Sequence, residues 1–174
     1  IVSEDRDGTV MDITSYGRTT RVNLRLPGRG SCYDALAAYA VAELMGASID
    51  DIRYVLEAFR PLPGRLQLLR ASNGALIIND CWTSSPESVA EAAAYFAKFD
   101  GQRKIVVLGE MEDLGGYAAE AHFEAGQQMA SAGAELLLAT GPHAEDIASG
   151  AAAHSRTRVQ TFPDARAIAG YLRT

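Results

Sequence analysis

The chain has 174 residues, of which 48% are hydrophobic, and it carries a formal net charge of −6. This composition excludes a disordered chain, and the acidic balance argues against a nucleic-acid or anionic membrane partner, since neither attracts an acidic surface. Two cysteines are too few for a disulfide framework and no apolar run is long enough to span a bilayer, so we expect a reduced, cytoplasmic setting.

The first part of the chain predicts a β-hairpin followed by two helices. Tyr16-Gly17-Arg18 is typical of a turn between two segments of alternating hydrophobicity, and Pro27-Gly28-Arg29-Gly30 ends the hairpin. Ser48 is expected to cap the second helix. The prolines of segment 60–64 end that helix, and we expect a linker there that separates a first domain, 1–62, from a second, 63–174. The expected elements are strands at 9–14 and 19–26 and helices at 33–45 and 49–59.

From residue 63 onward, strands alternate with helices, which indicates βαβ units and a largely parallel sheet. Ser72-Asn73-Gly74 predicts a tight hairpin turn, and the apolar run 75–78 after it is interpreted as a buried strand. Right-handed crossovers would bring the ends of four strands to one edge of the sheet. These strands pass through Ile77, Val106, Leu137 and Val159. The expected elements are strands at 65–71, 75–79, 104–108, 135–139 and 158–162, and helices at 86–97, 118–132, 142–153 and from 163 or 164 to 172.

Asp80 lies where the strand at 75–79 would leave the sheet, just before a helix start at which Ser85 can act as cap and Pro86 suits the first position. A carboxylate facing a helix N-terminus with free N–H groups is how many α/β proteins hold a nucleotide. The alternative is an ordinary strand–loop–helix joint with a solvated, solvent-facing Asp. The segment 109–113 belongs to the same predicted edge, whereas His122, on a helix, is expected to be a surface or packing residue.

Several motifs with their own chemistry are absent. The sequence has no G-x-x-x-x-G-K-[ST], no G-x-G-x-x-G after a strand, no nucleophile elbow and no paired metal-ligand histidines. We therefore assign no metal ligand in this chain and leave its catalytic residues unknown.

The order of features resembles the back half of the Mur ligases, the ATP-dependent family that extends the peptidoglycan stem peptide, and most of all the type that adds D-alanyl-D-alanine to UDP-N-acetylmuramoyl-tripeptide. The resemblance covers nearly the whole chain. The resemblance implies an α/β fold class: the end of a central ATPase domain, followed by a Rossmann-like C-terminal domain with a mainly parallel sheet. The matching segments are Pro27-Gly28-Arg29, Ala35-Leu36-Ala37-Ala38, Pro63-Gly64-Arg65, Asp80 with Pro86, Val107-Leu108-Gly109-Glu110-Met111, Leu114-Gly115 and Ala121-His122 with Gly126.

In that family ATP lies between the two domains, the acyl substrate is phosphorylated, and an incoming amine attacks the acyl phosphate. The resemblance therefore implies ATP and Mg²⁺ as cofactors, with the phosphate loop upstream of Ile1, and a nucleotide-linked peptide or other small molecule as substrate. We expect a monomer with neither nucleic acid nor membrane as partner. Arg65 would approach phosphate and Asp80 the ribose, since a guanidinium suits phosphate oxygens and a carboxylate accepts from two hydroxyls. A salt bridge between Arg65 and an acid is the alternative.

The resemblance supplies the candidate site residues and also shows where this chain departs from the family. After Pro-Gly-Arg the family usually has His-Asn and a later Asn, and after Asp80 it usually has an aromatic followed by Asn-Ala-Asn-Pro. Here Gly30, Ser31 and Asp34 replace the first set, while in the second Trp82 keeps the aromatic and Thr83 and Ser85 replace both amides. Three hypotheses follow: a peptidoglycan ligase, a Mur-like amide ligase of another pathway, and a non-catalytic Mur-like module that binds a ligand or partner. The candidates are Arg65, Asp80 and Asp34 for nucleotide binding, and Trp82, Thr83, Ser84, Ser85 and Glu110 for substrate binding.

Overall fold

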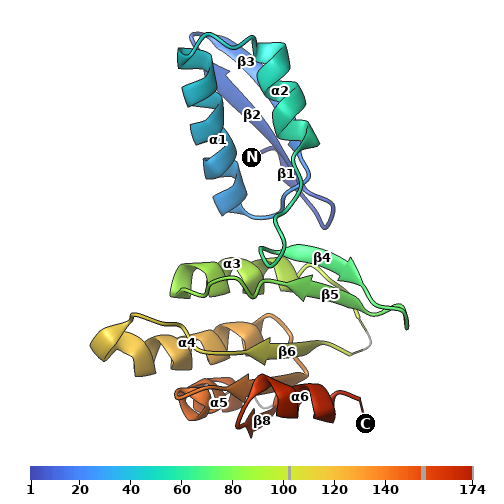
Figure 1. Cartoon of the computed structure of the whole chain (residues 1–174), viewed down its shortest axis with the longest axis vertical. Coiled ribbons are helices and arrows are strands. Elements are labelled where there is room, and N and C mark those ends of the chain that lie inside the picture. Colours follow the sequence, from blue (N-terminus) through green and yellow to red (C-terminus); the bar gives the residue numbers. More distant parts are fainter. Residues whose placement is uncertain (102, 154–155, 174) are drawn as a thin grey trace. The chain divides into compact units, whose positions relative to one another are not determined.

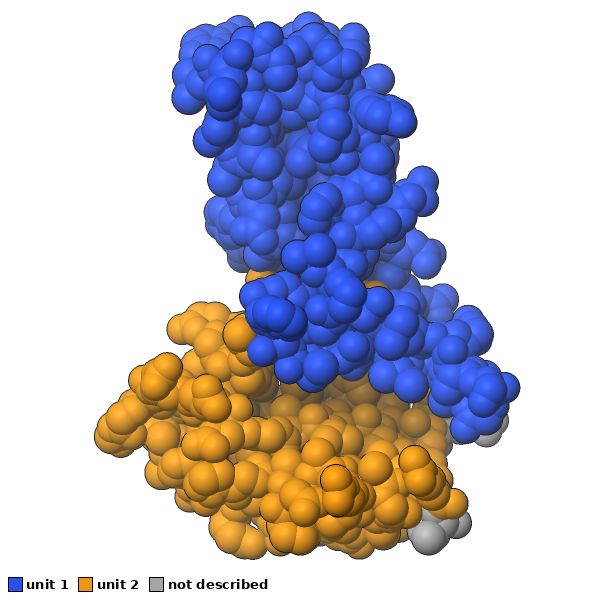
Figure 2. Space-filling model, viewed as in Figure 1, with its two compact units in different colours: residues 1–82 blue, residues 83–174 orange. Residues whose placement is uncertain are grey.

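The computed structural model describes residues 1–101, 103–153 and 156–173 (Figure 1). The chain forms two compact units, Ile1–Trp82 and Thr83–Thr174 (Figure 2). The hairpin that follows the expected linker is thus grouped with the first unit, and the domain boundary between residues 62 and 63 stays a prediction. None of the described helices has both the length and the hydrophobicity that a bilayer crossing requires.

The first unit begins with an antiparallel sheet in the order β1-β2-β3. Its strands are β1 (Ser3–Glu4), β2 (Thr9–Ser15) and β3 (Arg18–Leu24). Tyr16 and Gly17 join β2 to β3 with positive φ angles of 46° and 77°, a turn whose twist matches that of the strands. Alternate residues point into a core that includes Ile13 and Val22, which are 3% and 0% exposed. The predicted hairpin is therefore confirmed.

Two helices, α1 (Arg29–Leu44) and α2 (Ile49–Ala58), pack on this sheet through Tyr39 and Ile52. The Ser48 hydroxyl caps α2 by accepting a hydrogen bond from the Asp51 N–H at 3.1 Å, as predicted. Helix α1 starts four residues before the expected start at residue 33. The chain turns at Gly28, whose φ of 90° favours glycine, so Gly30 lies inside the helix rather than in the break before it.

A second hairpin, β4 (Gln67–Arg70) with β5 (Leu76–Asn79), completes the first unit. The prediction that segment 75–78 is a buried strand is wrong, because Leu76 and Ile77 are 43% and 46% exposed. Among the described strands β5 pairs with β4 alone, so the strand through Ile77 does not join the parallel sheet. A short apolar run does not distinguish a buried parallel strand from a half-exposed hairpin strand, since both satisfy their backbone groups by pairing.

The second unit is a parallel sheet in the order β6-β7-β8 with helices on both faces. The middle strand is an almost fully buried apolar run: Leu137 packs towards α3, α4 and α5, and Leu138 packs towards Ile168 of α6. The expected α/β class with a parallel sheet is confirmed. The elements are α3 (Pro86–Phe96), β6 (Ile105–Leu108), the 3₁₀ turn η1 (Gly115–Tyr117), α4 (Ala118–Ser131), β7 (Leu136–Thr140), α5 (Ala144–Ala152), β8 (Arg158–Phe162) and α6 (Ala165–Tyr171).

Helices α4 and α5 approach each other so closely that two glycines are required. A Cβ on Gly126 would overlap the carbonyl oxygen of Ile147, and a Cβ on Gly150 would overlap that of Phe123. The backbones of the two helices are therefore in direct contact. This crossing fixes the N-terminal end of α5 against α4, next to the ends of β6 and β7.

Candidate functional site

At the base of the β4–β5 hairpin, Asp80 is joined to Leu66, the residue that follows Arg65 and precedes β4. The Oδ1 atom of Asp80 accepts a hydrogen bond of 2.9 Å from the Leu66 N–H. Leu66 has a φ of 43°, in the left-handed region that a branched residue rarely adopts. The Asp80 carboxylate therefore holds the backbone residue that follows Arg65. We call Gly64, Arg65, Leu66, Asp80 and Trp82 the hairpin-base site.

A second bond closes the hairpin-base site. The Trp82 N–H donates to the Gly64 carbonyl at 3.1 Å, so the segments entering and leaving the hairpin are joined. Gly64 has a φ of 78°, and a Cβ there would lie 3.3 Å from the Trp82 nitrogen, which explains the glycine. The indole of Trp82 stays 69% exposed, so it is accessible to a ligand.

The Arg65 side chain is exposed and forms neither a hydrogen bond nor an ion pair with any residue that the structure describes, while its backbone N–H donates to the Leu62 carbonyl at 3.1 Å. The alternative of a structural salt bridge at Arg65 therefore has no partner within the described ranges. Asp80 is partly buried, and one of its oxygens accepts the Leu66 N–H. This corrects the alternative of a solvated, solvent-facing Asp80. Its second oxygen has no bond to a described residue. The Arg65 guanidinium and the second oxygen of Asp80 are thus available at the base of the same hairpin.

The start of α3 differs from the expectation of free N–H groups. Ser85 accepts from the Ser88 N–H at 3.2 Å, and Ser88 Oγ accepts from the Ser85 N–H at 2.9 Å, so the predicted cap is confirmed as a capping box. Hydrogen bonding by its own backbone N–H and by the Ser85 hydroxyl lowers the pKa of the Glu87 carboxyl from its ordinary value. Pro86 has no N–H. The first turn of α3 therefore satisfies its own N–H donors, and few of them remain to bind an anion.

Thr83 and Ser84 are exposed just before this cap. Asp34 is an exposed residue of α1, and its side chain bonds no residue that the structure describes. Neither a hydrogen bond nor an ion pair links it to Arg65 or Asp80 within the described ranges. The substrate roles of Thr83, Ser84 and Ser85, and the nucleotide role of Asp34, stay predictions.

A second set of groups lies in the other unit, at the carboxyl ends of β6 and β7. Gly141 follows β7 with a φ of 99°, and a Cβ on it would lie 3.4 Å from the Glu110 Cβ, so the two loops touch. Glu110 is exposed and forms no bond with a described residue. Met111 beside it is only 3% exposed and belongs to the core. We call Glu110, Met111, His122, Gly141 and His143 the sheet-edge site.

His122 is the residue of this site that the sequence prediction understated. Its ring is fully buried, Nε2 accepts from the Met111 N–H at 2.8 Å, and Nδ1 lies 2.7 Å from the Ala118 carbonyl oxygen. These partners assign a neutral ring with its proton on Nδ1. His143 stacks on it, with centroids 4.5 Å apart and planes 20° apart, and bonds Asp146 Oδ2 at 2.7 Å.

The prediction of a surface or packing residue is confirmed for packing and wrong for the surface, because the ring is fully buried, and it missed the bond to the loop after β6. A signal exists in the sequence, because His122 shares a helix face with Ala125, Gly126 and Met129, an otherwise apolar stripe. A polar ring in such a stripe needs partners from elsewhere in the fold, and helix periodicity does not identify them.

Within the ranges that the structure describes, no three His, Cys, Asp or Glu side chains gather in a way that would hold a metal ion. These residues therefore do not fit a Mg²⁺ site by themselves, and we derive no step through that ion. The free guanidinium and carboxylate oxygen of the hairpin-base site do fit the phosphate and ribose of a nucleotide.

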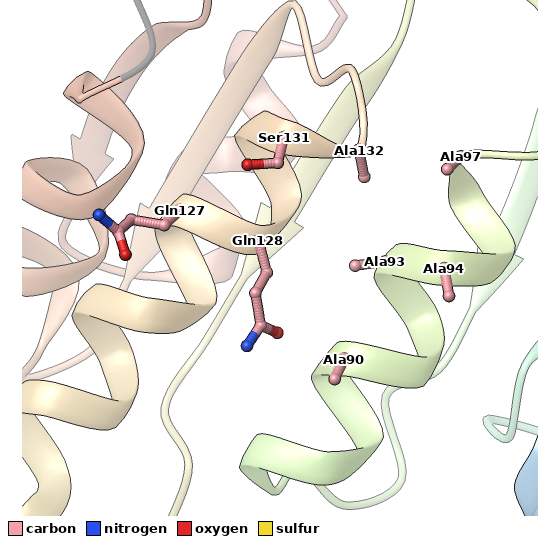
Figure 3. A pocket seen from close by; sticks show the side chains of 8 residues that line it. All are labelled: Ala90, Ala93, Ala94, Ala97, Gln127, Gln128, Ser131 and Ala132. Carbon is pink, nitrogen blue, oxygen red and sulfur yellow. The ribbon is translucent and has the colours of Figure 1, made fainter.

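A groove of about 480 Å³ runs between α3 and α4 (Figure 3). Its lining is made of small and neutral polar side chains, and Gln128 points from α4 towards α3. No charged side chain is among its lining residues. The lining residues are Ala90, Ala93, Ala94, Ala97, Gln127, Gln128, Ser131 and Ala132.

Comparison with known proteins points to one family. The family described as "Mur ligase, glutamate ligase domain" matches residues 64–173. The UDP-N-acetylmuramoyl-tripeptide–D-alanyl-D-alanine ligase of Escherichia coli K12 is 30% identical over 163 residues, which is 87% of this chain and 36% of that protein. The chain therefore spans about a third of this relative.

Two solved structures are similar over almost the whole chain. A MurF structure from Acinetobacter baumannii has a TM-score of 0.86 and 25% identity, over 98% of this chain and 36% of that one. The MurF ligase of Thermotoga maritima in complex with ADP has a TM-score of 0.76 and 24% identity, over 95% of this chain and 37% of that one. The second likeness shows a shared fold.

Proposed function

The chain belongs to the Mur ligase family, and from that premise we propose that it is the C-terminal part of an ATP-dependent ligase that adds D-alanyl-D-alanine to a UDP-N-acetylmuramoyl peptide. The similarity to the E. coli ligase that is named for this reaction supports the substrates. The observation that carries the proposal is the hairpin-base site, where the Arg65 side chain and the second oxygen of Asp80 lie at the two ends of one hairpin without a partner among the described residues.

In the proposed reaction the acyl carboxylate of the peptide takes the γ-phosphoryl group of ATP and forms an acyl phosphate, with ADP as the other product. The amine of the dipeptide then attacks the acyl carbon, the C–O bond to phosphate breaks, and the amide forms with loss of a proton and release of phosphate. Arg65 binds phosphate oxygens, and Asp80 accepts hydrogen bonds from the ribose hydroxyls. The ADP complex of the T. maritima MurF supports a nucleotide of this kind.

The chain's own polar groups are candidates for holding the peptide substrates. The exposed Glu110 carboxylate suits the ammonium form of the incoming amine, and the exposed Trp82, Thr83 and Ser84 supply an aromatic face and two hydroxyls. Ser85 is less available to bind a substrate, because its hydroxyl already caps α3. Mg²⁺ as the companion of ATP, a monomeric state and a cytoplasmic location stay predictions.

A Mur-like amide ligase with different substrates is the second candidate. Thr83 and Ser85 stand where the family usually has amide side chains, and Ser85 is committed to the helix cap. These two differences change the polar groups available to a substrate while the hairpin-base site keeps Arg65 and Asp80.

The test is a ligase assay on the full-length protein with ATP, Mg²⁺, UDP-N-acetylmuramoyl-tripeptide and D-alanyl-D-alanine. We expect phosphate release that requires both substrates, a product of the expected mass, and strong loss of turnover in Arg65→Ala. Arg60→Ala is the matched control, since the Arg60 guanidinium bonds only nearby carbonyls among the described residues. Turnover with other amines alone would favour the second candidate, and absence of ATP binding would reject catalysis.

A further inference from the structure

The loop that carries Glu110 is fixed by a side chain from another element. Along this loop Glu110 points outwards, while Met111 is buried and its N–H bonds His122 Nε2 at 2.8 Å. The bond joins the loop after β6 to the second turn of α4 across eleven residues of sequence. Neither the proposed ATP contacts nor the core packing accounts for a polar ring at this position.

The His122 ring has little freedom. Its Nδ1–H donates to the Ala118 carbonyl one turn earlier, and one face of the ring stacks on His143. The place of His143 is in turn set by the glycine crossing of α4 and α5, because His143 is the residue that precedes α5. Nε2 therefore presents a lone pair in a fixed direction, and the Met111 N–H meets it.

We propose that His122 is the positioning residue of the incoming-amine site: by accepting from the Met111 N–H it holds Glu110 against Gly141, where the Glu110 carboxylate binds the amine substrate. This inference rests on the proposed ligase function. His122 itself touches no substrate and exchanges no proton in the reaction. Its contribution is to order the loop before the amine arrives, which lowers the entropy lost on binding.

Two variants separate the positioning role from simple packing. The amide of His122→Gln reaches about as far as Nε2 and keeps an acceptor for the Met111 N–H. The shorter amide of His122→Asn reaches about as far as Nδ1, so it keeps the bond to Ala118 and loses the acceptor. Both variants are neutral and polar, and each keeps one of the two bonds of the ring: His122→Gln keeps the bond to Met111, and His122→Asn keeps the bond to Ala118.

The first measurement is hydrogen–deuterium exchange of segment 109–115 in the full-length protein, followed by mass spectrometry. In His122→Asn we expect exchange of this segment to be roughly 10- to 100-fold faster, because a buried donor is left without its partner. His122→Gln should exchange at close to the wild-type rate. His143→Phe is the control, since it keeps an aromatic ring stacked against His122 and leaves the bond between His122 and Met111 intact.

The second measurement is steady-state kinetics. In His122→Asn the KM for D-alanyl-D-alanine should rise about tenfold, the order expected for one lost hydrogen bond, with little change in the KM for ATP, and His122→Gln should restore it. Glu110→Ala should show the same rise in KM without faster exchange, because its side chain is exposed, so the proposal stays testable if both His122 variants misfold.

Equal behaviour of the Asn and Gln variants, or an equal rise in both KM values, would overturn the positioning role. If the wild-type protein shows no ligase turnover, the proposed function fails, while the exchange experiment still decides whether His122 orders the loop.

Discussion

The hairpin-base site and the sheet-edge site hold their polar groups in opposite ways. At the hairpin base a partly exposed carboxylate, Asp80, restrains Leu66 in a left-handed conformation, and the strands beside it are half exposed. At the sheet edge a fully buried ring, His122, restrains the loop from inside the protein. At the hairpin base Asp80 positions Leu66 and, in our proposal, also binds the nucleotide. At the sheet edge, in our proposal, His122 positions the loop and Glu110 binds the amine substrate.

This difference sets what a mutation at each site reports. A two-stranded hairpin has marginal stability by itself, whereas the parallel sheet is covered on both faces. The hairpin base should therefore open more often than the sheet edge, and substitutions at Asp80 mix loss of order with loss of binding. At the sheet edge the two effects separate, since Glu110 has no described partner and His122 has no exposed surface.

The largest effect is expected where α4 crosses α5. Gly126→Ala or Gly150→Ala places a Cβ on a backbone carbonyl that cannot move without separating the helices, so we expect destabilisation by roughly 1–3 kcal/mol or more. The measurement is the melting temperature of the second unit in the full-length protein.

Gly170→Ala in α6 is the matched control, because nothing lies within 4 Å of a Cβ there, and it should be neutral or slightly stabilising. Equal melting temperatures for all three variants would show that the close crossing does not support the sheet-edge site.

The next effect concerns the hairpin base. Asp80→Ala removes the acceptor of the Leu66 N–H, and the loss of a bond to a charged group costs about 1.5–3 kcal/mol, at the low end here because Asp80 is partly exposed. Faster exchange of segment 64–70 should report the change, with the sheet edge unaffected.

Asp80→Asn keeps an oxygen for Leu66 and should exchange nearly as slowly as the wild-type protein. Equal exchange in the Ala and Asn variants would mean that the Leu66 bond does not order the turn.

A smaller effect is expected at the cap of α3. Ser85→Ala removes the hydroxyl that accepts from the Ser88 N–H, which should destabilise the second unit by about 1 kcal/mol in chemical denaturation. Ser84→Ala, one residue earlier and exposed, should leave stability unchanged. A Ser85→Ala protein with wild-type stability but impaired turnover would instead favour the substrate role that the sequence suggests for Ser85.

The smallest effect is a titration. The Glu87 N–H and the Ser85 hydroxyl lower the pKa of Glu87 from its ordinary value, and Ser85→Ala should raise it back towards that value. Because the folded pKa is the lower one, the contribution of Glu87 to stability is present above its unfolded pKa and is lost as pH falls through its folded pKa. NMR titration of labelled glutamates would check the sign, and an unchanged pKa in the variant would contradict this capping arrangement.

The sequence predicts the fold better than the environment of the site. Helix and strand positions in the second unit follow from periodicity and from the Ser85 cap, which is confirmed. The burial of segment 75–78 was predicted wrongly because four apolar residues have no period that separates a hairpin from a core strand. The partners of Asp80 and His122 were missed because both bonds join residues far apart in sequence and end on backbone N–H groups, which no side-chain pattern encodes.

The proposed role of Asp80 in nucleotide binding is tested most directly by titrating the full-length protein and its Asp80→Asn variant with ATP and with 2′,3′-dideoxy-ATP. The variant keeps the oxygen for Leu66 and replaces the one assigned to the ribose. We predict that the wild-type protein binds ATP roughly 10- to 100-fold more tightly than dideoxy-ATP, and that Asp80→Asn binds both nucleotides equally and weakly. The same preference for ATP in both proteins, with unchanged affinity in the variant, would contradict the assignment of Asp80 to the ribose.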